Sequence, residues 1–253
     1  MAGFFGFGNY QKPGKGVAKQ QKEKKRFFQF WDLFCRKFTK LIKLNLLFLL
    51  FCIPIVTIGP AFAAMTKIAR YYVEEKPVFL LSDFWAAFKE NFFQALPIGI
   101  LHLGLIYVIW QAFFFYYVQA HSNGLFWILI GIILLLAILI LFSSYYIYLV
   151  MVSVSLKLWQ ILKNSVMFIF IGIRTNLLTL LFATSIMALS ILAMPLSIPV
   201  FLLIGFSMST LITVFNSRPY VYEYLMKPYY EYAGVENPYE PKEEEESVFE
   251  DTI

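Results

Sequence analysis

The sequence predicts an all-α fold, that of a polytopic helical membrane protein, and its composition, its apolar runs and its charge distribution support this. Of the 253 residues, 60% are hydrophobic and 15% are charged, and the mean hydropathy is +0.68. Soluble globular chains are about 45–50% apolar and about 25% charged. One soluble core of this size does not bury so many apolar side chains, so the lipid bilayer is the first partner that the sequence predicts.

Residues 1–26 are predicted to be a disordered, basic cytoplasmic tail, because they are rich in Gly, Lys and Gln and hold few aliphatic residues. Ten Lys and Arg residues precede the first apolar run. A basic end of this kind stays on the cytoplasmic side of a membrane. Beside a membrane segment it favours anionic lipid heads over nucleic acid, so no nucleic-acid partner is expected.

Residues 27–225 are predicted to be a single helical membrane domain, which begins with an amphipathic helix over Phe27–Leu44. The apolar run Leu41–Ile58 then spans about 27 Å as a helix, which barely matches the hydrocarbon thickness. Pro54 interrupts this run and Gly59 and Pro60 follow it, so residues 27–78 are interpreted as an amphipathic helix followed by a broken, re-entrant membrane segment. The residues assigned to the structural break are Pro54, Thr57, Gly59 and Pro60.

Two helical hairpins are predicted to follow, in residues 79–152 and 153–217. In the first, Ser82 is expected to cap an amphipathic helix that continues into the membrane helix Leu96–Gln119. A tight turn rich in polar residues then returns the chain as a second membrane helix, Leu125–Val152.

The second hairpin repeats this order. Leu156–Phe170 is amphipathic at its start, and Leu177–Met194 and Val200–Phe215 are the two membrane helices, joined by a turn at Pro195–Pro199. The repetition fits an internal duplication of the kind found in transport proteins. It equally fits the general likeness of any two hydrophobic hairpins.

The distribution of Lys and Arg predicts the topology. Neither hairpin turn carries a Lys or Arg. Ten such residues lie before the first pair of membrane helices, between the two pairs and after the second pair. If Leu41–Ile58 enters the membrane and returns, these ten lie on the same side as the ten of the N-terminal region, which the positive-inside tendency favours. Four full crossings with both termini in the cytoplasm are therefore predicted. Five simple crossings, with the C-terminus outside, are the alternative.

The sequence offers little that points to chemistry. It has no glycine-rich phosphate loop, no paired His at ligand spacing, no nucleophile elbow and no acidic pair. No catalytic residue, metal or cofactor is therefore expected, and the protein is not predicted to be an enzyme. His102, the one ionisable residue well inside a predicted span, is interpreted as hydrogen-bonded to a neighbouring helix. Residues 226–253 form an acidic C-terminal tail, which is expected to be solvated.

The remaining candidate is the surface at the cytoplasmic boundary, where two amphipathic helices are expected to anchor at the lipid headgroups or to dock a partner. The residues assigned to this partner contact are Phe84, Phe88, Lys89, Asn91, Lys157, Trp159, Lys163 and Asn164.

Three stretches of the chain resemble one protein family. They are Ile53–Ala61, with the sequence IPIVTIGPA, then Phe84–Ala95 and Lys163–Ser165. Over roughly residues 27–225 the sequence is similar to the YesL-like family of bacterial membrane proteins, formerly a domain of unknown function. The resemblance implies a multi-pass plasma-membrane protein of Gram-positive bacteria, commonly encoded beside carbohydrate ABC importers, and it brings no catalytic residues.

The expected function is that of a non-enzymatic accessory subunit, which binds the permease subunits of a carbohydrate ABC importer and stabilises or regulates them. The sparse polar lining of the predicted spans and the two interfacial helices favour this function. The alternative is a small solute transporter, or a permease component, that itself acts in carbohydrate uptake. Solute flux in liposomes by this chain alone distinguishes the two.

Overall fold

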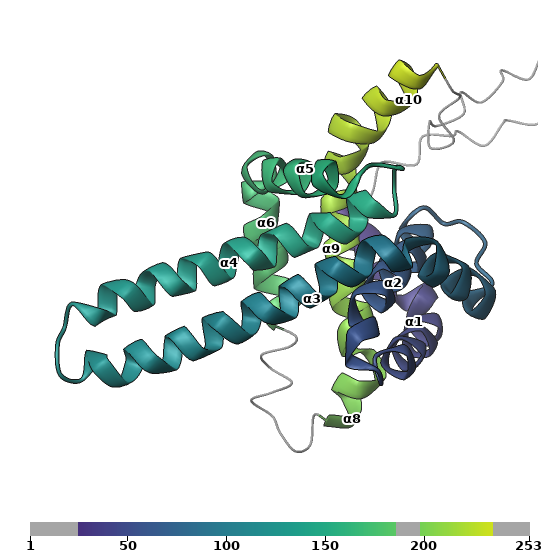
Figure 1. The fold of residues 1–253 in the computed structure, drawn as a ribbon. Coiled ribbons are helices and arrows are strands. Elements are labelled where there is room, and N and C mark those ends of the chain that lie inside the picture. Colours follow the sequence, from purple (N-terminus) through teal and green to yellow (C-terminus); the bar gives the residue numbers. More distant parts are fainter. Residues whose placement is uncertain (1–24, 186–197, 235–253) are drawn as a thin grey trace, which may run out of the picture. The chain divides into compact units, whose positions relative to one another are not determined.

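The computed structural model describes residues 25–185 and 198–234, and it is helical without a strand in these residues, which confirms the predicted all-α class. The chain falls into two compact units, residues 1–36 and 37–253, and the contacts described below lie within the second. The helical elements are α1 (Arg26–Phe51), η1 (Ile55–Thr57), α2 (Ile58–Val73), α3 (Leu80–Ala120), α4 (Phe126–Met151), α5 (Leu158–Ile171), α6 (Ile173–Thr179), η2 (Leu180–Thr184), α8 (Ile198–Val200), η3 (Phe201–Gly205), α9 (Phe206–Val221), η4 (Tyr222–Met226) and α10 (Lys227–Ala233) (Figure 1). Of these, η1 is a 3-10 turn, and η2, η3 and η4 are π-helical.

The first helix ends close to the predicted break. α1 stops at Phe51, and Pro54 precedes the short turn η1. The hydroxyl of Thr57 lies 2.6 Å from the carbonyl oxygens of both Phe51 and Pro54 and donates to them. Thr57 therefore provides a donor for the carbonyl group of Phe51, one of those that the end of a helix leaves without a helical partner.

After the break, α2 folds back along α1. The rings of Phe48 and Phe62 lie 4.7 Å apart, and the ammonium group of Lys37 lies 5.6 Å from the centre of the Tyr72 ring. As the residue number falls along α1, the number of the contacting residue on α2 rises, so the two segments run in opposite directions. Lys37 and the C-terminal end of α2 consequently lie at the same end of this pair.

α2 and α3 pack together through two glycines. A Cβ atom added to Gly99 would lie 2.6 Å from the Cα atom of Gly59, and one added to Gly59 would collide with the backbone of Ala95. Glycine at both positions lets the two backbones touch. Gly59, predicted as part of the break, is thus a packing residue in the first turn of α2. Pro60 lies in the same turn, where the missing N–H of proline costs no helical hydrogen bond.

α3 is one continuous helix of 41 residues, which corresponds to about 61 Å. The predicted cap at Ser82 is wrong, because the helix begins at Leu80 and the carboxylate of Asp83 accepts a hydrogen bond from the N–H of Phe79 at 2.8 Å. A negative charge in the first turn is also favoured by the helix dipole. The amphipathic helix therefore continues into the membrane helix as the sequence predicts, and the two form one helix with Pro97 inside it.

α3 and α4 form a long hairpin (Figure 1). Both helices are long and apolar enough to cross a membrane. α4 covers Phe126–Met151, close to the predicted Leu125–Val152. In the turn between the helices, the side-chain oxygen of Asn123 accepts a hydrogen bond from the N–H of Leu125 at 3.0 Å, which helps to close the turn.

The second half of the chain departs from a simple hairpin. α5 is bent by 90° from the helical segment that follows Gly172. At this bend the hydroxyl of Tyr146 donates to the side-chain oxygen of Asn176 at 2.7 Å, and a Cβ atom on Gly172 would collide with that hydroxyl. α3 is uninterrupted at the corresponding place, so the two predicted repeats differ at this point. The end of the predicted helix Leu177–Met194 and the start of the turn after it lie outside the described residues.

The predicted tails are described only in part. Residues 1–24 and 235–253 lie outside the described residues. The start of the predicted C-terminal tail is helical, because residues 227–233 form α10 and residue 226 ends η4. Helical structure therefore continues about two turns beyond the predicted end of the membrane domain.

Asn45 of α1 holds the start of the C-terminal helices. Its side-chain nitrogen donates to the carbonyl oxygen of Leu202 at 2.6 Å, and its side-chain oxygen accepts from the N–H of Ser207 at 2.8 Å. These two backbone groups are five residues apart, at the junction of the π-helical η3 and α9. The buried side-chain amide of Asn45 thus hydrogen-bonds to both ends of this π-helical turn from another helix, α1.

Candidate functional site

A buried charge cluster joins α2, α4 and α9. The side chains of Arg70 and Glu74 are only 2% and 3% exposed. They lie four residues apart, so both project from the same face of the end of α2. Charged side chains are seldom buried so completely unless they are paired. These residues, with Lys76 and Arg218, are called the Glu74 cluster below.

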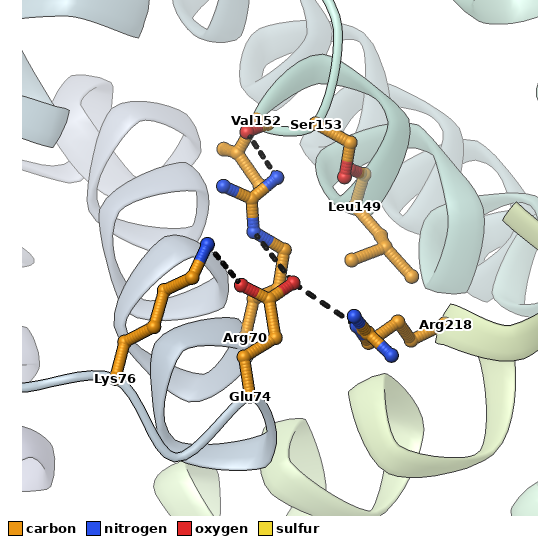
Figure 2. A network of polar contacts seen from close by, with 7 residues as sticks. All are labelled: Arg70, Glu74, Lys76, Leu149, Val152, Ser153 and Arg218. Carbon is orange, nitrogen blue, oxygen red and sulfur yellow. Dashed lines mark hydrogen bonds and ion pairs between the residues drawn. The ribbon is translucent and has the colours of Figure 1, made fainter. Parts of the chain in front are cut away.

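Figure 2 shows Glu74 at the centre of this cluster. Its Oε1 accepts a hydrogen bond from Nε of Arg218 at 3.0 Å and lies 3.6 Å from Nε of Arg70. Its Oε2 lies 3.0 Å from Nζ of Lys76. One carboxylate therefore links three cations, and it ties α9 to the end of α2.

Arg70 also reaches the end of α4 (Figure 2). Its Nη1 donates to the carbonyl oxygen of Val152 at 2.8 Å, and Val152 is the C-cap of α4. The last carbonyl groups of a helix lack helical partners and carry the negative end of the helix dipole, so a guanidinium group is favoured there. Ser153 donates to the carbonyl oxygen of Leu149 at 2.6 Å, which satisfies another group of the same turn.

A polar cavity of about 710 Å³ lies beside the Glu74 cluster and shares Arg70 with it. Lys67 of α2 and Glu90 of α3 form an ion pair on its wall. On another wall, the hydroxyl groups of Ser155 and Tyr229 are hydrogen-bonded at 2.9 Å, which connects α10 to the segment after α4. The size and the polar groups of this cavity suit water or a small polar ligand.

The chemistry of these groups is that of binding. Guanidinium, ammonium and phenol groups donate hydrogen bonds and attract anions. Within residues 25–185 and 198–234, no group of three or more His, Cys, Asp and Glu side chains is placed to hold a metal ion. The cluster and its cavity are therefore suited to holding helices together and to binding a polar or anionic group.

Three of the predicted partner-contact residues are buried on α3. The rings of Phe84 and Phe88 lie 5.1 and 5.0 Å from the ring of Phe51. The side-chain nitrogen of Asn91 donates to the carbonyl oxygen of Ala87 at 2.9 Å. These three side chains contact their own chain, so in this structure they offer little surface to a partner.

The other predicted contact residues are nearer the surface. Lys89 is exposed on α3, with its ammonium group 5.2 Å from the centre of the Trp85 ring. At the start of α5 and along it, the structure exposes Lys157, Trp159 and Lys163 and half-buries Asn164. Gln94 of α3 donates to the carbonyl oxygen of Leu156 at 3.3 Å, just before α5. α3 and the start of α5, which carry these predicted contact residues, therefore approach each other. The role of these residues in partner binding stays a prediction.

Sequence reasoning did not identify the Glu74 cluster or Asn45. The four-residue spacing of Arg70 and Glu74 near the end of a predicted helix is a local signal for an ion pair. The third member, Arg218, is 144 residues from Glu74, and no local pattern connects them. A polar Asn45 inside an apolar run is a signal for a buried hydrogen bond, although its partners lie more than 150 residues away.

A protein-family model described as "Protein of unknown function, DUF624" matches residues 41–113. The matched region contains the fold-back of α1 and α2, the Gly59–Gly99 contact and the greater part of α3. Comparison with curated proteins gave no match, and comparison with solved structures gave none either. The chain is thus similar to a family of unknown function over this region, and the similarity brings no activity or site residue with it.

Proposed function

We propose that this protein is a non-enzymatic accessory subunit of the bacterial plasma membrane, which binds the permease subunits of a carbohydrate ABC importer and stabilises or regulates them. The α3–α4 hairpin carries this proposal. Each helix has an apolar window of 18 residues. Only 17% of this window in α3 and 11% of it in α4 is buried inside the chain. Two helices so little covered leave most of their apolar surface to lipid and to the helices of a partner.

The orientation that we propose puts the Glu74 cluster on the cytoplasmic side. Basic residues gather at this end of the helices, namely Lys37, Arg70, Lys76 and Arg218. The turn between α3 and α4 carries no Lys or Arg, so the positive-inside tendency supports this orientation. α1 and α2 then form a re-entrant pair that enters and leaves from the cytoplasm, and four other segments cross the bilayer.

Large exposed aromatic side chains are the anchors that such a subunit would offer to a partner. Trp110 of α3 is 60% exposed, and Trp159 of α5 is 75% exposed. Trp is enriched among residues that dominate binding energy at protein interfaces. The hairpin would contact the membrane helices of the permease, and α5 would contact its cytoplasmic loops.

Co-purification tests this proposal. Full-length protein with an affinity tag is extracted from membranes of its own bacterium in mild detergent, and bound proteins are identified by mass spectrometry. We expect permease subunits of a carbohydrate importer to be enriched over an unrelated tagged membrane protein. Trp110→Ala or Trp159→Ala should reduce this enrichment, whereas Tyr232→Ala, at a 97% exposed position on α10, should not. Recovery of the tagged protein without importer subunits in several detergents contradicts the proposal.

A second candidate function is that of a small solute transporter or permease component, and the polar cavity of about 710 Å³ favours it. This cavity has the size of a small-molecule site. The measurement that separates the two functions is uptake of labelled sugars into liposomes that contain only this chain. Uptake above that of empty liposomes supports a transporter, and uptake only when the permease and ATPase are also present supports the accessory subunit.

A further inference from the structure

A second cavity lies between the membrane-capable hairpin and its neighbouring helices. Its volume is about 350 Å³, and α2, α3, α4 and α9 form its walls. Most of its lining is apolar, as at Phe62, Leu103 and Val214, and a few polar groups interrupt it. The volume is about twice that of an apolar cavity that accepts a benzene molecule. This cavity is called the Tyr145 cavity below.

The hydroxyl of Tyr145 on its wall has no hydrogen-bond partner among the residues that the structure describes. The Tyr145 side chain is only 7% exposed. Buried hydroxyl groups in folded proteins nearly always have a partner, because an unsatisfied one loses its hydration without compensation. The missing partner is therefore a hydrogen-bond acceptor from outside the described chain.

Three other polar side chains on the wall, those of His102, Ser144 and Thr213, already contact backbone carbonyl groups of their own helices. Ser144 donates to the carbonyl oxygen of Leu141 at 2.7 Å, and Thr213 donates to that of Ser209 at 2.8 Å. Nδ1 of His102 lies 3.1 Å from the carbonyl oxygen of its own helix one turn earlier. A sugar or another strongly polar ligand needs several free partners. The lining is instead mostly apolar, and the hydroxyl of Tyr145 is a buried donor on it without a hydrogen-bond partner among the described residues.

The position of Tyr145 along α4 points to the ligand. It lies six residues before the end of α4 at Met151, which corresponds to about 9 Å along the helix axis. In the proposed orientation, that end of α4 is the cytoplasmic one, so Tyr145 lies near the depth at which hydrocarbon gives way to the polar interfacial region. At this depth, the ester groups of a glycerolipid present carbonyl oxygens at the top of their acyl chains.

We propose that the Tyr145 cavity binds one acyl chain of a membrane glycerolipid, whose ester carbonyl oxygen accepts a hydrogen bond from Tyr145. The acyl chain matches the apolar walls, and the carbonyl oxygen supplies the acceptor that the described residues lack. In the proposed orientation the bilayer surrounds α3 and α4, which form two walls of this cavity, so the lipid needs no aqueous route to it. This inference uses the proposed orientation and does not depend on binding to an importer.

Photo-crosslinking tests the site. Full-length protein in nanodiscs is illuminated with a phosphatidylglycerol that carries a diazirine in its acyl chain, and the labelled peptides are mapped by mass spectrometry. We expect labels at cavity residues such as His102, Ser144 and Thr210. Tyr145→Phe should lower this labelling about fivefold, the factor that one hydrogen bond typically contributes. Tyr107→Phe removes a hydroxyl from a 64% exposed side chain on α3 and should leave it unchanged.

Thermal unfolding separates a binding role from a structural one. Because the hydroxyl has no partner in the described chain, Tyr145→Phe should not lower the midpoint temperature in lipid-free detergent. Adding phosphatidylglycerol should raise the midpoint of the unmodified protein and of Tyr107→Phe more than that of Tyr145→Phe. The proposal is overturned if no cavity residue is labelled, if Tyr145→Phe and the unmodified protein respond equally, or if a free fatty acid with the same diazirine labels the cavity and the glycerolipid does not.

Discussion

The carboxylate of Glu74 accepts a hydrogen bond from Nε of Arg218 at 3.0 Å, although 144 residues separate them in the chain. Glu74 follows the last turn of α2, and Arg218 lies in α9. Between them, Arg70 connects the same carboxylate to the end of α4. Glu74, Arg70 and Arg218 together thus hold α2, α4 and α9 against one another.

Glu74→Gln should lower the free energy of unfolding by about 3 kcal/mol, because it leaves buried cations without their carboxylate. This is the lower end of the usual range, since the Arg218 side chain is 24% exposed. Denaturant titration in detergent micelles measures the change. Glu75→Gln alters an exposed neighbour and should have an effect of less than about 0.5 kcal/mol. In a double-mutant cycle with Arg218→Gln, additive effects would show that the pair is not coupled.

Gly59→Ala should separate α2 from α3 and lower the free energy of unfolding by about 2 kcal/mol, because the added methyl group has no space beside Ala95. Gly104→Ala on α3 is the matched control, since nothing lies within 4 Å of its added Cβ atom. It should be neutral or stabilise by up to about 1 kcal/mol through helix propensity. Equal effects of the two substitutions would rule out close packing as the reason for Gly59.

Asn45→Leu should cost about 2–4 kcal/mol, because it removes two hydrogen bonds and leaves the carbonyl group of Leu202 and the N–H of Ser207 unsatisfied. Leu46→Ala changes the next side chain, which is 47% exposed, and should cost much less. Amide hydrogen exchange gives a second readout, in which Asn45→Leu accelerates exchange at Ser207. Unchanged exchange there would show that Asn45 does not support this turn.

Thiol labelling in intact cells should establish the side of each helix end. In a variant without Cys35 and Cys52, Ser122→Cys at the hairpin turn should react with a membrane-impermeant maleimide added outside. Glu223→Cys should react only after permeabilisation, because the proposed orientation puts η4 in the cytoplasm. Glu223 is exposed, whereas Ser217 nearby is buried and would report poorly. Labelling at position 223 from outside would favour five crossings.

The long apolar elements could be predicted from the sequence because their signal is local. Hydrophobic runs and the polar turn after them located the α3–α4 hairpin closely, and proline located the end of α1. The sequence predicted that the amphipathic helix continues into the membrane helix, but it misplaced the start of α3, since Ser82 is an ordinary signal for a helix start. In this case Asp83 and Phe79 provide the start, and packing of α3 on α2 overrides the local preference at Pro97.

The candidate site was harder to predict, because it depends on contacts between distant segments. Arg218, Val152 and Glu74 meet only when three helices end at the same place. The burial of Phe84 and Phe88 likewise depends on Phe51, more than 30 residues earlier. On a helix considered alone these rings form an apolar face that resembles a docking surface. Only the fold shows that the chain's own first helix occupies that face.

The length of α3 connects two different parts of the molecule. Its first half is held against α2 around Gly59 and Gly99, while its second half runs out along the hairpin. The contacts with α2 extend along this first half, from the Lys67–Glu90 ion pair to the Gly59–Gly99 contact. The same half lines the polar cavity through Glu90, Asn91 and Gln94. The apolar hairpin that is suited to the bilayer and one wall of the polar cavity are therefore two parts of a single helix.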